Sequence, residues 1–293
     1  MLPSVTDGFS NVRRSNRRMI AAAVVLAILW IVVMLTRHTI WARWWGYKLR
    51  TSADVGQRLD YLAHLAGLGD ASVPVAAGLI RGNDMELRGY GLFLLSKVDS
   101  STATAHLRTA VDDADPDIRR IALQAYGRRG TQEVTRSLTA LMSDERTDVA
   151  LEAAAQLALT RGKEAVPILS DAARKHSNTG IRIQAIQLLA MIHAVETLDT
   201  LIECLADNGV YEGQTAMEAS ANRAVKAVLS AGSLPADADL STNGPAPVHI
   251  VGDEADKALR QLTGQSFDYR SDDPAARESA IAAWRQWRSL QGK

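Results

Sequence analysis

The chain has 293 residues, of which 47% are hydrophobic, 23% are charged and one is Cys. This composition excludes a disordered or collagen-like chain, and a single thiol excludes a disulfide framework and a zinc site made of several Cys. The charge is unevenly divided, because residues 1–50 contain 8 basic and 1 acidic residue, whereas the remainder contains 25 basic and 32 acidic residues.

Residues 1–18 are predicted to be a short basic tail, and residues 19–36 a transmembrane helix. The second stretch has 18 residues without a charge and would be about 27 Å long as a helix, close to the roughly 30 Å of a bilayer core. A cleaved signal peptide is the alternative, although the apolar run is longer than usual for a signal and no A-x-A site follows it closely. The sequence therefore favours an uncleaved, single-pass anchor in the cell membrane.

An aromatic and basic segment follows at residues 37–52. Four of its residues are predicted to lie at the membrane interface, as an aromatic belt does: Trp41, Trp44, Trp45 and Tyr47. Basic residues flank the apolar run on both sides, but four arginines are packed into six positions before it, namely Arg13, Arg14, Arg17 and Arg18. This density favours a cytoplasmic N-terminus, with the chain beyond residue 50 outside the cytoplasm.

Residues 53–232 contain an internal repeat. Four segments align from starting points 31, 31 and 32 residues apart, at Leu87, Ile118, Val149 and Ile181. Each has apolar residues at helical spacing, and a shorter apolar helix is expected before each, over residues 73–80, 103–111, 134–142 and 166–173, with a fifth over 198–205. Because one helix pair cannot bury both its faces, the pairs are predicted to stack into an all-α solenoid.

The second helices carry the clearest family resemblance. The sequence from Asp115 to Thr131, DPDIRRIALQAYGRRGT, resembles the second half of a short HEAT repeat of the kind seen in phycobilin-lyase-like proteins, and Glu164 to Ile192 resembles another copy. The resemblance implies an α-solenoid of stacked HEAT-like helical hairpins. It also implies that polar side chains of the second helices face the concave surface and bind a protein: Gln124, Arg128, Glu152, Gln156 and Gln187.

Three arginines recur at one position of the repeat, Arg88, Arg119 and Arg182. One interpretation is a stripe that binds acidic ligands. The favoured one, which the HEAT resemblance supports, is a ladder that pairs with turn acids such as Asp84, Asp115 and Asp117, although Ala150 interrupts the series.

The C-terminal part is predicted to close the stack. Residues 233–252 are rich in Pro, Ala, Asp and Ser and read as a linker or loop, and residues 253–293 as a helical cap with one helix ending at Gly264 and another beginning near Pro274. The segment from Leu259 to Trp287 resembles one that follows HEAT repeats in bacterial, planctomycete-like, membrane-anchored proteins. Trp284 and Trp287 share a helix face and are expected to cap the stack, with an exposed protein-binding anchor as the alternative.

No group of residues with recognisable chemistry is found. The six His are scattered, nucleophile-elbow and phosphate-loop motifs are missing, no useful strand is expected, and Cys204 reads as a buried apolar residue. The sequence therefore predicts no enzyme, no cofactor and no metal, and the net negative charge beyond residue 50 argues against nucleic acid. The resulting hypothesis is a membrane-anchored, non-catalytic scaffold for a protein partner. A phycobilin-lyase-like enzyme or ligand-binding subunit that uses the concave face is the alternative.

Overall fold

The computed structural model describes residues 6–221 and 246–291, with side chains from residue 23 onward except at positions 29 and 35. The chain divides into two compact units, residues 1–103 and 104–293. Most of the predicted linker over 233–252, the side chains of the basic tail and the end of the predicted repeat region lie outside the described residues.

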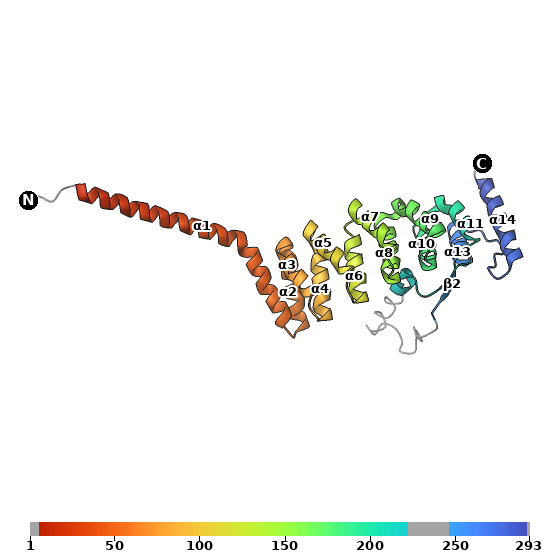
Figure 1. Cartoon of the computed structure of the whole chain (residues 1–293), viewed down its shortest axis with the longest axis horizontal. Coiled ribbons are helices and arrows are strands. Elements are labelled where there is room, and N and C mark those ends of the chain that lie inside the picture. Colours follow the sequence, from red (N-terminus) through yellow and green to blue (C-terminus); the bar gives the residue numbers. More distant parts are fainter. Residues whose placement is uncertain (1–5, 222–245, 292–293) are drawn as a thin grey trace, which may run out of the picture. The chain divides into compact units, whose positions relative to one another are not determined.

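The first unit is built from helices joined by short turns (Figure 1). Its elements in chain order are α1 (Thr6–Thr51), α2 (Val55–Gly67), the 3-10 turn η1 (Gly69–Ser72), α3 (Val73–Ile80) and α4 (Met85–Lys97). The next helix, α5 (Ser101–Ala110), crosses the boundary between the two units. Asp84 begins α4 by accepting hydrogen bonds from the backbone N–H groups of Glu86 and Leu87, which confirms the predicted start.

The segment predicted to lie at the membrane interface belongs to the folded unit instead of being separate. Residues 37–51 are the last turns of α1, and Ala42 and Leu49 on this part are buried. Gly46 lies so close to α3 that a Cβ atom there would be 2.5 Å from Val75 Cγ1. The end of α1 and α2 therefore form an additional helical hairpin, ahead of the five that the repeat predicts.

The apolar part of α1 is continuous with the helix that follows it. Among the described residues, no single helix is both long and apolar enough to cross a bilayer. Two parts of α1, Ala23–Met34 and Thr36–Thr51, pass that test only when taken together, and they are bent by 47° relative to each other.

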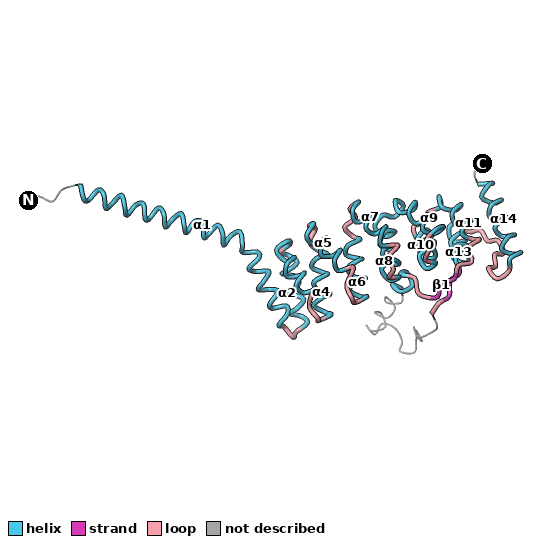
Figure 2. Tube along the Cα trace, in the orientation of Figure 1, coloured by secondary structure: helices cyan, strands magenta, loops and turns pink. Residues whose placement is uncertain are grey.

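The second unit consists of stacked helical hairpins, as Figures 1 and 2 show. After α5 come α6 (Pro116–Gly127), α7 (Gln132–Leu141), α8 (Thr147–Arg161), η2 (Gly162–Ala165), α9 (Val166–Lys175), α10 (Thr179–Met191), η3 (Val195–Thr197) and α11 (Leu198–Cys204). These helices coincide with the predicted pairs, which confirms the repeat. Asp115 and Asn178 cap α6 and α10 with their side chains, whereas α8 begins after Arg146 without a side-chain cap.

The fifth hairpin is interrupted by an insertion. Strand β1 (Val210–Glu212) pairs antiparallel with β2 (Val248–Ile250), with Tyr211 opposite His249. Helix α13 (Val251–Thr263) then packs against α10 and α11, just as α10 packs against α8 and α9. The helix expected from residue 253 is therefore the second helix of the fifth hairpin. The sequence predicted no strand of useful length, and it did not reveal this ribbon of two three-residue strands.

The final helix, α14 (Pro274–Gln291), packs against α11. Asp273 accepts hydrogen bonds from the backbone of Ala275 and Ala276, and Gly264 ends α13 with a φ of 71°, so both predicted boundaries are confirmed. Trp284 is fully buried, with its ring 4.7 Å from that of Phe267 and 5.7 Å from that of Trp287.

Candidate functional site

The candidate site lies on the side of the second unit formed by its second helices α6, α8, α10 and α13, here called the second-helix face. A segment from the insertion, residues 209–221, runs against this face (Figure 2). Thr215 and Glu218 begin its helical part, because each side chain hydrogen-bonds the backbone N–H of the other residue. The backbone N–H of Ala216 also donates to Oε1 of the fully buried Gln184 on α10, at 2.8 Å, which holds the segment in place.

Three of the predicted contact residues form one hydrogen-bonded group. Oε1 of Glu152 accepts from Nε2 of Gln124 at 3.1 Å and from Nε2 of Gln156 at 2.9 Å. Glu152 and Gln156 are both buried. Gly127 makes this packing possible, since a Cβ atom there would lie 2.9 Å from Cβ of Gln156. The sequence placed these residues on one face, and the structure brings them into direct contact.

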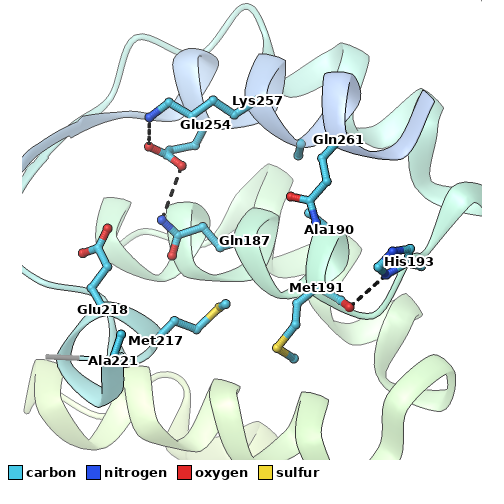
Figure 3. A pocket seen from close by; sticks show the side chains of 11 residues that line it. Gln187, Ala190, Met191, His193, Met217, Glu218, Ala221, Glu254, Lys257 and Gln261 are labelled. Carbon is cyan, nitrogen blue, oxygen red and sulfur yellow. Dashed lines mark hydrogen bonds and ion pairs between the residues drawn. The ribbon is translucent and has the colours of Figure 1, made fainter. Parts of the chain in front are cut away.

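The other two predicted contact residues lie apart from this group. Arg128 is exposed at the end of α6. Nε2 of Gln187 donates to Oε2 of Glu254 on α13 at 3.3 Å, as Figure 3 shows. The buried His249 stands between two carboxylates, with Nδ1 3.2 Å from Glu254 and Nε2 3.3 Å from Glu218.

Lys257 completes this second polar group with a 2.7 Å contact to Glu254 Oε1. Burial raises the pKa of Glu254, but the hydrogen bonds from Lys257 and His249 outweigh it and leave that pKa below its ordinary value. Sequence reasoning missed Glu218, His249 and Glu254. The one available signal was the capping pattern T-x-x-E at Thr215–Glu218, which marks a helix start.

Two cavities of similar size are among those that open on the second-helix face. One, of about 600 Å³, lies along α8 and is lined by Gln124, Arg128, Glu152, Gln156, Leu159 and other residues. The other, of about 570 Å³, lies between α10 and α13 and is lined by Gln187, His193, Glu254, Gln261 and other residues (Figure 3). Both share Met191 and Met217, so methionine side chains separate them. Each is within the range of small-ligand pockets and of holes that accept a partner's side chain.

Two of the three recurrent arginines join neighbouring repeats, as the ladder interpretation expects, but with other acids than predicted. Arg119 pairs with Asp148 of the next repeat at 2.7 Å, and Arg182 pairs with Asp207 at 2.8 Å. Arg88 donates to the backbone carbonyl of Ile80 at 3.0 Å. The predicted partners have other tasks: Asp84 and Asp115 cap helices, and Asp117 pairs with Arg120 within α6. The carboxylate of a capping Asp already accepts hydrogen bonds from backbone N–H groups. Arg119 and Arg182 therefore pair with an acid of the next repeat instead.

The four aromatic residues predicted at a membrane interface divide into two groups. Trp41, Trp44 and Tyr47 are exposed on α1. Trp45 instead turns toward α2, with its ring stacked on His64 at 4.2 Å and 5.5 Å from Tyr61. At the other end of the chain, Trp284 is buried and Trp287 half-buried.

The described residues contain no group of three His, Cys, Asp or Glu side chains that could hold a metal ion. Burial raises the pKa of the Cys204 thiol to about 12, so this side chain is protonated at neutral pH and unsuited to nucleophilic attack.

Comparison with known proteins identifies the repeat. The sequence model of HEAT repeats matches residues 72–157 and 135–221, which together make up just over half of the chain. No curated protein matches the chain. Among solved structures, human deoxyhypusine hydroxylase in complex with glycerol is similar, with 18% identity and a TM-score of 0.43 over 87% of this chain and 98% of that one.

Two other solved structures are similar at the same level. The complex of CpcE and CpcF of phycocyanin lyase from Nostoc has 20% identity and a TM-score of 0.36, over 66% of this chain and 65% of that one. The Escherichia coli protein YibA has 18% identity and a TM-score of 0.39, over 82% and 91% of the two chains.

The prediction that the chain is not an enzyme needs correction. The similar structures include a hydroxylase and a lyase, so HEAT-like repeats occur in catalytic proteins. Missing sequence motifs therefore do not exclude an activity for a chain of this architecture, because function depends on the site and not on the fold.

Proposed function

The chain belongs to the HEAT-repeat family, and from this premise we propose that it is a scaffold, anchored in a membrane by α1, that binds a protein partner through the second-helix face. The observation that carries the proposal is the pair of cavities on that face, which offer apolar walls edged by polar side chains. Interfaces of protein complexes combine apolar holes with polar rims in this way. Stacked hairpins present such a surface at little cost in conformational entropy, since the helices are already ordered.

The anchor is proposed from the sequence and from the exposure of α1. The run without charges over residues 19–36 has the length of a bilayer core. Its described apolar side chains are exposed, among them Val24, Val25, Leu26, Ile28, Trp30 and Ile31. Large exposed apolar surfaces of this kind are buried in a membrane or in a partner. Trp41, Trp44 and Tyr47 would then lie at the headgroups, and Trp45 would support the hairpin of α1 and α2.

The proposed topology has the N-terminus in the cytoplasm and the repeats outside it. The four arginines before the apolar run support this orientation, and the resemblance of residues 259–287 to bacterial membrane-anchored proteins suggests a bacterial envelope. A reporter that is active only outside the cytoplasm, fused after Lys293 in intact cells, tests the proposal. Activity is expected, whereas an inactive reporter on a membrane-retained fusion would place the repeats in the cytoplasm.

Photo-crosslinking tests the partner surface directly. A photoreactive amino acid replaces Leu159, whose side chain is 64% exposed at the edge of the α8 cavity. The matched control carries the same amino acid at Arg136, an exposed position on the first helix α7. A discrete protein adduct is expected from position 159 only. Adducts from position 136 alone, or from neither position, would count against the second-helix face as the binding surface.

A further inference from the structure

Glu152 is a buried acid that has no cationic partner. Three acidic residues are buried in the described part of the chain, Glu152, Glu254 and Asp256, with exposed fractions of 5%, 7% and 4%. Glu254 pairs with Lys257 and His249, and Asp256 pairs with Arg260. No described Lys, Arg or His forms an ion pair with Glu152. Buried carboxylates are rare unless they are paired, so this one requires an explanation.

The hydrogen bonds of Glu152 leave half of its carboxylate unused. Both neighbouring amides, from Gln124 and Gln156, donate to Oε1. Oε2 accepts no hydrogen bond from any described residue. The two amides fix the direction of the carboxylate and stabilise charge on one oxygen, but being neutral they do not compensate the charge. The second oxygen therefore remains available to a donor from outside the chain.

The surroundings of Glu152 define what that donor can be. The carboxylate lines the α8 cavity of about 600 Å³, whose lining includes one cation, the exposed Arg128, and the structure gives no ion pair between Arg128 and Glu152. Apolar side chains from three segments line the same cavity: Ala155 and Leu159 of α8, Leu188 and Met191 of α10, and Met217 of the insertion. A ligand that fits must combine a cation with an apolar stem, because the cation compensates the carboxylate and the stem covers the apolar wall.

We propose that Glu152 binds the ammonium or guanidinium group of a Lys or Arg side chain that the protein partner inserts into the α8 cavity. The methylene stem lies against Leu159, Met191 and Met217, and the head group donates to Glu152 Oε2. Charge complementarity supports a basic segment as the occupant, since the chain beyond residue 50 has 32 acidic against 25 basic residues. The inference rests on the proposed function, of which it names the partner chemistry.

The test uses n-hexylammonium as a probe that resembles the Lys side chain, with hexanol as its uncharged equivalent. Binding to the full-length chain is followed by NMR of methyl-labelled methionine, because Met191 and Met217 line the cavity. Hexylammonium is expected to shift both resonances and to bind about tenfold more tightly than hexanol, as a charged hydrogen bond of about 1.5 kcal/mol implies. Equal affinities of the two probes would overturn the inference without any mutation.

The variant Glu152→Gln removes the charge and keeps the shape and the acceptor oxygen. It is expected to bind hexylammonium about tenfold more weakly than the natural chain and hexanol equally well. Glu133→Gln is the matched control, since Glu133 is exposed on α7 and its loss changes the net charge by the same amount. Unchanged hexylammonium binding by E152Q would contradict the proposal.

The crosslinking result separates failure of this inference from failure of the proposed function. If the adduct at position 159 forms equally well with Glu152 and with Gln at position 152, the partner binds this face without a cation at Glu152, and only the inference fails. If hexylammonium binds through Glu152 but position 159 gives no adduct, the cation site exists and the occupant is not a protein, which overturns the proposal as stated.

Discussion

At the scale of single residues, His193 has a strained backbone conformation at a position where other repeats have glycine. Among the described residues it alone has a positive φ without being glycine, at 52°. It ends α10 in a Schellman motif, with its N–H bonded to Ala190 O and that of Ala194 bonded to Leu189 O. Gly130 and Gly162 hold the left-handed positions after α6 and α8. The repeat formed by α9 and α10 therefore differs from the two repeats before it, which have glycine at this position. The His193 side chain lines the α10–α13 cavity.

We expect His193→Gly to stabilise the protein by up to about 1 kcal/mol, because the strain of the left-handed conformation is removed and partly offset by the greater freedom of glycine when unfolded. Urea denaturation measures the change. Gly130→Ala, with a φ of 61° and no crowding around its Cβ position, is the opposite control and should cost about 1 kcal/mol. A destabilised H193G variant would mean that the imidazole contact with the Met191 carbonyl, at 3.1 Å, outweighs the strain.

The sequence predicted the helix face on which a side chain lies where the repeat determines that face. It did not predict contacts between side chains of helices that are distant in the sequence. Gln124, Glu152 and Gln156 could be assigned to one face because the resemblance to HEAT repeats implies which side of the second helices faces the concave surface. Their mutual hydrogen bonds could not be predicted, since these depend on how closely α6 and α8 approach. That approach depends on Gly127, whose missing Cβ leaves room for Gln156.

At the scale of elements, Arg146 takes over where the arginine ladder is interrupted. Ala150 stands at the ladder position in α8, and Arg146 instead joins the turn before α8 to the turn after α5. Its Nη2 lies 2.8 Å from Asp112 Oδ1, and its Nε lies 2.9 Å from Asp144 Oδ1. The hydrogen bonds from Arg146 hold the pKa of both carboxyl groups below the ordinary value of 3.8.

Arg146→Ala should therefore lower the free energy of unfolding at pH 7, by about 1 kcal/mol, because these partly exposed pairs form a network but are screened by solvent. A carboxyl group whose pKa is depressed in the folded state stabilises the protein above its unfolded pKa, and this contribution is lost as the pH falls through the folded pKa. The difference between the natural chain and R146A should thus shrink from pH 7 toward pH 3 in urea titrations. Arg120→Ala, which removes a pair within one helix, is the control. An R146A effect that is constant with pH would show that it arises from packing.

The β1–β2 ribbon within the insertion between α11 and α13 is the element that sequence patterns missed. Strands β1 and β2 have three residues each, too short for an alternating pattern, and more than thirty residues separate them in the sequence. The helices of the other hairpins were predictable because short turns join them. Where a long insertion separates α11 from α13, only the packing of α13 on α10 reveals that the two helices form one hairpin.

At the scale of the whole molecule, the hairpins within each unit pack mainly on their neighbours, so disturbances should remain local. Gly46 allows α1 to approach α3 in the first unit. Trp284 is the buried centre of α14 in the second unit, where that helix covers α11. These two positions lie at opposite ends of the repeat series in the sequence, and each has a change that should loosen only its own end.

Gly46→Ala places a methyl group where Val75 Cγ1 would be 2.5 Å away, and is expected to cost about 1–3 kcal/mol. Trp284→Ala leaves a large cavity and should cost about 3–5 kcal/mol. Hydrogen exchange is expected to accelerate in α1 to α3 for the first variant and in α11, α13 and α14 for the second, with the central helices α6 and α8 protected in both. The double variant G46A/V75A should recover part of the protection lost in G46A, because it removes the methyl group that clashes. Equal acceleration of hydrogen exchange across both units in either single variant would contradict this expectation. It would mean that the chain unfolds as one cooperative body and not locally at the altered end.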